Sequence, residues 1–405
     1  MKSLKVKIKL DKLQQIQINT LSNEHRLLYN HLLDFVKKND VCDFKKINNE
    51  YKNYRLNNKL TINSKSAQNT SRTFINNIKS YFALIKTDKT ARFPNTFKSW
   101  KYFTSFQYDC NNGSGGYKLK DNCLIINLLN KSKIHIDLPD YCNILNNDMV
   151  KTVTFMKTKN DYYLCFSYND KNRLKNDLDT NNFISIDLGI SNLYTFVSNK
   201  INSESLVNSR FENLERQIKY IQSIQDKKKK YSKHWKKINK RYIRLKRKLA
   251  DKNKDFQHKV STNLIKQCKE NNIGAIICGD IKVKKIINKE NKRLKSASKN
   301  SGLSRFKTFL EYKSKNEGMI FDKVNEAYTS QRNSYTNNIE YKNLKLSDRE
   351  VYLTNTVKID RDLNSAINIA KKIKGKWLTQ IEDFEKIISN FHKIYMNNSS
   401  ATIYI

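Results

Sequence analysis

The stretch FISIDLGISNLYTFVSN, residues 183–199, decides how the second half of the chain is interpreted. It is typical of two adjoining strands, and the first is so apolar that it is expected at the centre of a sheet. Asp187 closes this first strand, and a carboxylate among apolar strand residues is unfavourable unless it is paired or binds a metal. A hydrogen-bonded turn Asp, two residues before Gly189, is the alternative interpretation, and this stretch alone leaves both open.

Strands and helices alternate after this stretch. AIICG at 275–279 is expected to be a second buried strand and GMIFDKV at 318–324 a third, with helices over 304–317 and 362–374. Strands that alternate with helices indicate an α/β domain, which we assign to residues 180–405.

The first half of the chain predicts an α+β arrangement of its own. Leu4, Val6 and Ile8 alternate with lysines, which indicates a strand with one buried face and one basic face. Apolar residues at helical spacing predict helices over 22–87, and runs of period two predict strands over 97–178. We expect these strands to form a small β-barrel that is closed with help from the first strand.

The net charge of +40, from 78 Lys and Arg against 38 Asp and Glu, points to a polyanionic partner. So large an excess of one sign destabilises a compact chain by self-repulsion unless a polyanion neutralises it. Nucleic acid is the natural partner, and its binding would weaken as salt rises. A coding sequence rich in A and T also raises the content of Lys, Asn, Ile and Tyr without any functional reason. The composition alone is therefore also compatible with a protein that does not bind nucleic acid.

The densest positive charge lies in a predicted helical hairpin at 212–250. Residues 227–248 contain 13 Lys and Arg and no acid, which covers roughly six helical turns. A solvated helix face is the usual meaning of a charge run, but the absence of acids here favours a face that follows nucleic-acid phosphates. The residues expected to make these contacts are Lys227, Lys228, Lys229, Lys230, Lys236, Lys237, Lys240, Arg241, Arg244 and Arg247.

Three aromatic residues at the start of the strand region are candidates for a second kind of contact. Trp100, Tyr102 and Phe103 could stack on bases, as aromatic side chains do in sites for single-stranded nucleic acid. Packing in the core of the expected barrel is the favoured alternative.

A second group of acids stands near the end of the chain. In IDRDLNSAINIAKK, residues 359–372, Asp362 and Asn364 stand at the head of an amphipathic helix. N-capping by Asp360 or Asp362 is the ordinary explanation for either residue taken alone. A two-metal nuclease, however, needs carboxylates from distant segments, because two Mg²⁺ ions must stabilise the attacking and leaving oxygens. Acids at a strand end and a helix start in one α/β domain fit that requirement.

These motifs resemble those of the TnpB (OrfB) proteins of insertion sequences, which are relatives of Fanzor proteins and of type V CRISPR effectors. IDLGISNLYTF at 186–196 is similar to their first RuvC motif, YTSQ at 328–331 to the entry of their zinc ribbon, and DRDLNSAINIA at 360–370 to their third RuvC motif. The basic hairpin, FKSW at 97–100 and VKTVTF at 150–155 also match, so the resemblance covers nearly the whole chain.

The resemblance implies a domain organisation and a function. It implies a wedge β-barrel made of residues 1–20 and 96–179, a helical recognition domain at 21–95, and a RuvC-like domain of RNase H fold at 180–405. It further implies an RNA-guided DNA endonuclease whose partners are a guide RNA and a target double-stranded DNA. In such proteins base pairing reads the sequence, while a cationic channel holds the heteroduplex by its shape and backbone.

The chain departs from the family in the zinc ribbon. Where family members carry a Cys pair after YTSQ, this chain has Asn333 and Thr336, and the second pair, expected in VYLTNTV at 351–357, is also missing. A zinc site cannot form from these residues, so we expect no zinc. Without metal, the degenerate insert at 329–358 is expected to be a loose loop or small hairpin.

The chain also departs from the family in the middle catalytic acid. The second motif of the family usually ends a strand in Glu-Asp-Leu, whereas CGDI at 278–281 has Gly279 in place of the Glu. One branch of the family, including Fanzor-type proteins, uses a Glu just before the YTS segment, and Glu326 stands there, 47 residues after Gly279. The catalytic and Mg²⁺-binding residues that the resemblance implies are Asp187, Glu326 and Asp362, with Asp280 as the alternative to Glu326 and Asp360 as the alternative to Asp362.

Three functions are compatible with these motifs. The first is an RNA-guided DNA endonuclease in which the three acids bind two Mg²⁺ ions and a metal-bound water attacks the DNA. The second is a catalytically weakened or inactive RNA- and DNA-binding remnant or repressor, which the missing zinc ribbon favours. The third, a strand-transferring transposase, has the least support, because the chain has six His and no paired His motif.

The cysteines and the hydropathy indicate the compartment. The seven Cys form no CxxC pair, which predicts reduced thiols and no disulfide framework. No apolar run approaches the roughly 20 residues of a membrane span, and MKSLKVKIKL has no apolar core of a signal peptide. We therefore expect a cytoplasmic or nucleoid protein, nuclear if the host is eukaryotic, with no membrane partner.

Overall fold

The computed structural model describes residues 2–39, 43–109, 116–129, 132–158, 161–169, 178–208, 211–280, 301–344, 348–355 and 357–373. The chain divides into two compact units, residues 1–172 and 173–405. Cys42, Cys110 and Thr356 lie outside the described residues. The other five Cys are unpaired in the part of the chain that the structure describes.

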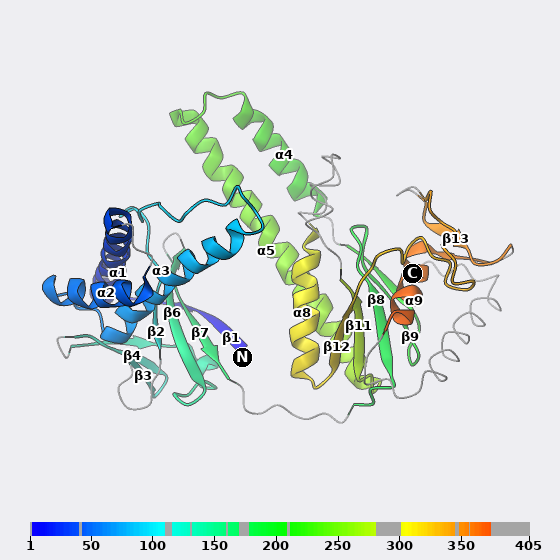
Figure 1. Cartoon of the computed structure of the whole chain (residues 1–405), viewed down its shortest axis with the longest axis horizontal. Coiled ribbons are helices and arrows are strands. Elements are labelled where there is room, and N and C mark those ends of the chain that lie inside the picture. Colours follow the sequence, from blue (N-terminus) through cyan, green and yellow to red (C-terminus); the bar gives the residue numbers. More distant parts are fainter. Residues whose placement is uncertain are drawn as a thin grey trace. The chain divides into compact units, whose positions relative to one another are not determined.

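Three helices form one side of the first unit (Figure 1). They are α1 (Lys12–Asn39), α2 (Phe44–Asn57) and α3 (Ser64–Ile85). The side chain of Asp43 accepts a hydrogen bond from the amide of Lys45 and caps α2, and Asn63 caps α3 in the same way. The helices predicted over 22–87 are confirmed, although α1 already begins at Lys12.

The strands of the first unit form two antiparallel sheets. The larger has the order β1–β7–β6–β2 and the smaller the order β3–β4–β5. Their bounds are β1 (Lys2–Ile8), β2 (Phe106–Asp109), β3 (Tyr117–Lys120), β4 (Cys123–Asn127), β5 (Lys133–Asp137), β6 (Val150–Thr158) and β7 (Asp161–Tyr168). In β1, Val6 and Ile8 are buried and Lys5 and Lys7 are exposed, which confirms the predicted alternation.

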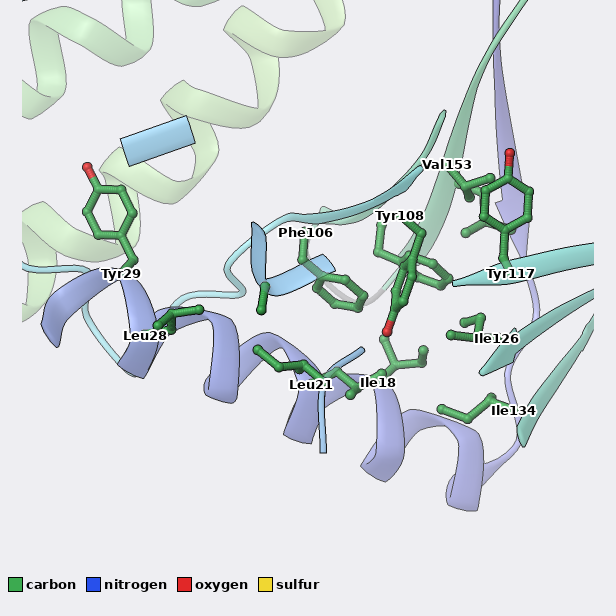
Figure 2. Close-up of a cluster of buried hydrophobic side chains, with 14 of the residues drawn as sticks. Ile18, Leu21, Leu28, Tyr29, Phe106, Tyr108, Tyr117, Ile126, Ile134 and Val153 are labelled. Carbon is green, nitrogen blue, oxygen red and sulfur yellow. The ribbon is translucent and has the colours of Figure 1, made fainter. Parts of the chain in front are cut away.

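The described strands do not close into the β-barrel expected of residues 96–179 and the first strand. β1 joins this region by pairing with β7, but it and β2 remain the edges of their sheet, as β3 and β5 do in theirs. The four strands from β2 to β5 are short, at four or five residues each. Their apolar side chains are covered by α1 instead, and Ile18 and Leu21 lie in one buried cluster with Phe106 and Tyr108 (Figure 2).

The three aromatic residues before β2 differ in their surroundings. Phe103 is partly buried and its ring packs edge-on against Tyr162, at 6.1 Å between centroids. Trp100 and Tyr102 are 75% and 77% exposed, because they lie in the turn that precedes β2. Core packing, the favoured prediction for all three, is therefore correct for Phe103 and wrong for Trp100 and Tyr102.

The second unit is built on a five-stranded sheet with the order β10–β9–β8–β11–β12. Its strands are β8 (Phe183–Asp187), β9 (Asn192–Ser198), β10 (Glu204–Val207), β11 (Ala275–Gly279) and β12 (Ile320–Val324). β11 runs parallel to β8 and β12, whereas β9 runs antiparallel to β8 and β10. β8 is the central strand, as its apolar sequence predicted.

Helices cover both faces of this sheet (Figure 1). On one face, Ile184 and Ile276 share a buried cluster with Phe306 of α8 (Leu303–Asn316) and with the end of α5 (Lys233–Glu270). On the other face, Phe183 and Ile277 share a cluster with α9 (Arg361–Lys371). Of the described helices, none is both long and apolar enough to span a membrane. The predicted α/β layers of this unit are therefore present.

We expect Ile277→Ala to destabilise the second unit by about 2–5 kcal/mol, because Ile277 is fully buried in β11 and its truncation leaves a cavity. The measurement is the urea dependence of hydrogen exchange at the amides of β8 and β11. Ile243→Ala is the control, since Ile243 is 40% exposed on α5 and its truncation should change stability by less than about 0.5 kcal/mol. Equal effects of both substitutions would contradict the proposed core.

Candidate active site

The carboxyl ends of three neighbouring strands meet at one edge of the second sheet. Cys278 pairs with Ile186 in the parallel ladder of β11 and β8, so Asp187 and Gly279 end these strands side by side. Gly279 pairs in turn with Val324 at the end of β12. Ligands of open α/β sheets bind outside the carboxyl ends of parallel strands. This edge is therefore the place where acids from distant segments can meet.

Glu326 occupies the space in front of Gly279. A Cβ atom added to Gly279 would lie 2.1 Å from Oε1 of Glu326 and 2.6 Å from its Cγ. Both contacts are closer than real Cβ atoms show, so any side chain at position 279 would displace Glu326. The carboxylate of Glu326 can therefore reach the end of β11 only because residue 279 has no side chain.

The carboxylate of Glu326 is largely withdrawn from water and is incompletely paired. Its Oε1 is buried, and no described group forms a hydrogen bond with this atom. Burial raises the pKa of Glu326 to about 7, and the charge of Asp280 adds to this, while Lys307 and Lys372 act in the opposite direction. A buried acceptor without a partner is rare in proteins, and a cation or a proton would satisfy it.

Asp360 and Asp362 have different roles at the start of α9. The side chain of Asp360 caps the helix, accepting hydrogen bonds from the amides of Asp362 at 2.8 Å and Leu363 at 3.1 Å. Asp362 instead accepts one from Nδ2 of Asn192 at 3.0 Å and lies 3.4 Å from Nη1 of Arg349. Helix capping therefore accounts for Asp360 and leaves the carboxylate of Asp362 directed to Asn192, at the start of β9.

Asp187 interacts with both of the other predicted acids. Burial raises its pKa well above the usual value, and the charges of Glu326 and then Asp362 raise it further, while Arg361 opposes them. Its carboxylate accepts no hydrogen bond from any residue that the structure describes. Such mutual repulsion is characteristic of carboxylates that share one site.

The acids are nevertheless not gathered into a closed ligand set. In the part of the chain that the structure describes, no three His, Cys, Asp or Glu side chains are close enough to form a metal-binding group as they stand. Their chemistry still suits a hard cation, because carboxylate oxygens are its preferred ligands. The unpaired Oε1 of Glu326 and the free carboxylate of Asp187 are available for such a cation.

Asp280, the alternative middle acid, is engaged by α8. Its carboxylate forms an ion pair with Nζ of Lys307 at 2.5 Å, and the side chain of Asp280 is 40% exposed. Lys307 itself is mostly buried. Asp280 therefore already has a cationic partner, whereas Glu326 retains an unpaired oxygen.

Arg349 is a residue of the site that the motifs did not indicate. Its Nη2 donates a hydrogen bond to Oγ of Ser191 at 2.6 Å, and its Nη1 approaches Asp362. Its backbone carbonyl accepts from the amide of Arg361 at 2.7 Å. Arg349 lies in the insert before β13 (Glu350–Tyr352), within no recognisable motif, so only the fold could place it beside Asp362.

The predicted nucleic-acid interface forms an antiparallel pair of helices, α4 (Glu212–Asp226) and α5 (Figure 1). Leu214, Ile218 and Leu249 form a small buried cluster that joins them. All ten predicted basic contacts are exposed, and so is Tyr231, which has a positive φ of 69° between the two helices. The hairpin thus presents a cationic surface with an exposed aromatic ring near its tip.

Comparisons with known proteins agree with the motifs. Residues 163–285 match the OrfB_IS605 family, described as a probable transposase. Residues 304–369 match the Cas12f1-like TNB domain, a range that includes Arg349 and Asp362. The OrfB resemblance is confirmed. No curated protein matches the sequence significantly.

Solved structures were compared with the fold of this chain. The Cas12f1 subunit in a cryo-EM structure of the Cas12f1–sgRNA–target DNA complex has a TM-score of 0.62 and 15% identity, over 89% of this chain and 83% of that chain. A CRISPR-Cas12f ternary complex has a TM-score of 0.39 at 14% identity, over 88% and 81% of the two chains. Alicyclobacillus acidoterrestris C2c1 with single-guide RNA has 0.43 at 9%, over 84% and 64%. The first of these shows that the chain has an α+β fold similar to that of Cas12f1.

We expect Gly279→Ala to weaken Mn²⁺ binding by about tenfold or more, because the new methyl group displaces a carboxylate of the site. Binding is measured from the free Mn²⁺ signal in electron paramagnetic resonance. The exchanged pair Gly279→Glu with Glu326→Ala should restore affinity, since it returns one carboxylate to the same space. Asp280→Asn is the neighbouring control and should change affinity little. Loss of affinity in Asp280→Asn with none in Gly279→Ala would assign the site to Asp280 instead.

Proposed function

We propose that this protein is an RNA-guided DNA endonuclease of the RuvC type. The observation that carries the proposal is the fit of Glu326 into the space left by Gly279, which adds an acid to the strand end next to Asp187. A basic hairpin in the same unit provides a surface for nucleic acid. The similar Cas12f1 structure contains a single-guide RNA and a target DNA, and we propose a guide RNA and a double-stranded DNA target as partners here.

The proposal includes the domain organisation. Residues 180–405 would form the RuvC-like domain, which the sheet order around β8 supports. Residues 1–20 and 96–179 would form the wedge domain as two open sheets, and residues 21–95 the recognition domain. We propose action on DNA inside the cell, in the cytoplasm or nucleoid, or in the nucleus of a eukaryotic host.

Asp187, Glu326 and Asp362 would hold two Mg²⁺ ions. When bound, the ions would stabilise the charge on the attacking and leaving oxygens of the DNA phosphate. Asp187 is suited to be shared, because its carboxylate interacts with both other acids. Asn192 orients Asp362 through a hydrogen bond of 3.0 Å.

Two cationic residues shape this site. Lys307 keeps Asp280 engaged on the side of α8, which leaves Glu326 as the acid at the end of β11. The side chain of Arg349 is 46% exposed next to Asp362, so its guanidinium could also donate to a DNA phosphate, for which its planar fork is suited.

Further contacts to nucleic acid would come from both units. In the second unit, the exposed lysines at 227–230 would track phosphates. In the first unit, Trp100 and Tyr102 are exposed and Lys101 lies 5.8 Å from the ring of Trp100. Exposed aromatic rings among cations are suited to stacking on unpaired bases.

A second candidate function is nucleic-acid binding without cleavage. Two observations favour it: the described acids do not form a closed ligand group, and Arg349 lies against one of them, Asp362. A guanidinium that remained on Asp362 would compete with a metal ion for the same oxygen. In this case the protein would act as a repressor or as an inactive remnant.

To separate the two functions, the chain is produced together with the DNA that flanks its reading frame, and the RNA that copurifies is sequenced. The complex is then incubated with Mg²⁺ and a matched target library with randomised flanks. We expect cleavage, and a loss of about a hundredfold or more in Asp187→Asn. Asp280→Asn, the control acid, should still cut. Binding without cleavage would support the second function, and the absence of binding would contradict both.

Neutralising Lys227, Lys228, Lys229 and Lys230 with Gln should flatten the salt dependence of RNA binding, because each phosphate contact releases counterions. If all four contact phosphates, the slope of log K against log salt should change by about 3, measured by filter binding. The control replaces Lys259, Lys266 and Lys269, which lie on α5, the helix that follows these four lysines, but pair with acids. An unchanged slope in the first variant would mean that the face is merely solvated.

A further inference from the structure

The insert between β12 and α9 is held together by two tight turns. In the first, the amide of Asn333 donates to the carbonyl of Asn338 at 2.8 Å, and the amide of Asn337 donates to the carbonyl of Asn333 at 3.0 Å. In the second, the amide of Leu353 donates to the carbonyl of Val357 at 2.8 Å. These turns lie where the resemblance places the two pairs of zinc ligands.

The residues of the insert do not fit a zinc ion. Residues 329–358 contain no Cys and no His, and Asn333 offers an amide that forms hydrogen bonds in place of a thiolate. Its Oδ1 accepts from the amides of Tyr335 at 2.8 Å and Thr336 at 3.4 Å. Of the described residues, 350–352 and 358–360 form the small hairpin that was expected of this insert, and the turn at Asn333 has a defined hydrogen-bonded arrangement.

Asn333 joins the two turns directly. Its Nδ2 donates to the carbonyl of Leu353 at 3.0 Å and to Oε2 of Glu340 at 2.6 Å. The hydroxyl of Thr336 donates to the other oxygen of Glu340. Asn333 is 1% exposed, so these bonds are shielded from water, and its Nδ2 satisfies acceptors from two segments of the insert.

The first turn is also bound to α9, the helix that carries Asp362. The amide of Ser334 donates to Oδ1 of Asn364 at 2.9 Å, and Nδ2 of Asn364 donates to the carbonyl of Arg332 at 2.8 Å. Asn368 donates to the carbonyls of Thr329 and Arg332 at 2.9 Å and 2.6 Å. The insert is thus anchored to the helix through two buried asparagines one turn apart.

We propose that Asn333 is a metal-free clasp: a positioning residue that joins the two turns in place of a zinc ion and so holds Arg349 against Asp362. The link to Leu353 fixes one end of the hairpin formed by β13 and β14 (Lys358–Asp360). The bond from the amide of Arg361 to the carbonyl of Arg349 fixes its other end. Opening the clasp would leave Arg349 held by the Arg361 amide and by its side-chain contacts with Ser191 and Asp362 alone, so that its guanidinium leaves Asp362 more readily.

Hydrogen-exchange mass spectrometry of the full chain tests the clasp without reference to cleavage. Zinc measured by plasma mass spectrometry should be well below one atom per chain, and a zinc chelator should leave exchange over 350–360 unchanged. Asn333→Ala should speed exchange there by about tenfold or more, since buried partners lose their donor, while β8 and β11 stay unchanged. Asn338→Ala is the matched control, an exposed amide in the same turn, and should have no effect.

Asn333→Asp provides a second variant if Asn333→Ala does not fold. It keeps the acceptor for Tyr335 and Thr336 but loses the donor to Leu353, so the same speeding of exchange is expected over 350–360. One zinc atom per chain together with chelator-sensitive exchange would overturn the proposal. The proposal would also be overturned if the rate of hydrogen exchange over 350–360 were the same in the Asn333 variants as in Asn338→Ala.

The positioning of Arg349 is read from its rate of modification by phenylglyoxal, which should rise several-fold in Asn333→Asp and not in Asn338→Ala. An unchanged rate would overturn the positioning role. If the wild-type complex cleaves DNA, a further readout rests on the proposed function: Asn333→Asp should slow cleavage much less in an Arg349→Ala background than in wild type. Fully additive losses would show that Asn333 does not act through Arg349, and would leave the proposed nuclease function intact.

Discussion

The candidate site depends on the close approach of the Glu326 carboxylate to the backbone of Gly279. Carboxylates repel one another and lose hydration when they are buried, so placing Glu326 and Asp187 at adjacent strand ends is unfavourable without compensation. A surface loop would relieve this repulsion by moving apart. Here the parallel ladders fix Asp187 and Gly279 side by side, and the space before Gly279 admits one side chain only, that of Glu326. The repulsion between these two acids is therefore built into the sheet.

Helix α9 connects this strand edge to the insert. Asp362 lies in its first turn, and Asn364 and Asn368 hold the insert along its buried side. At its end, Lys372 donates to the carbonyls of Asn325, at 3.2 Å, and Ala327, the two residues that flank Glu326. One helix therefore sets the places of two acids that are 36 residues apart in the sequence. The inner face of α9 is almost fully buried, and a change in its packing against β8 would move both acids.

The sequence predicts most of this arrangement where the signal is local. The apolar run of β8, the period of β1 and the amphipathic pattern of α9 follow from residues within one element, and the structure agrees with all three. The barrel prediction failed because closure depends on strand length and on which helix covers an apolar face, and neither is a local property. Arg349 reaches Asp362 only through the fold of the insert, so no spacing rule could identify it.

The insert at 329–358 shows even more clearly that local sequence patterns do not reveal contacts between distant residues. The absence of Cys and His predicts that this insert binds no zinc, but looseness does not follow, because the partners of Asn333 are 7 and 20 residues away. The energies of the two kinds of interaction also show that the side-chain amide of Asn333 does not fully replace the stabilisation from a zinc ion. Structural zinc contributes about 10–16 kcal/mol in small zinc-finger peptides, whereas one hydrogen bond contributes about 1 kcal/mol net.

The remaining stability of the insert must come from contacts that a free zinc finger does not have. Val351, Leu353, Val357 and Ile359 of the insert lie in one buried cluster with α9, and burial of each such side chain contributes about 1.5–3 kcal/mol. These contacts exist only while the insert is docked on the helix. A metal-bound ribbon has a source of stability of its own, whereas the buried apolar side chains of this insert are packed against α9. Its stability and the placement of Arg349 beside Asp362 are therefore consequences of the same contacts.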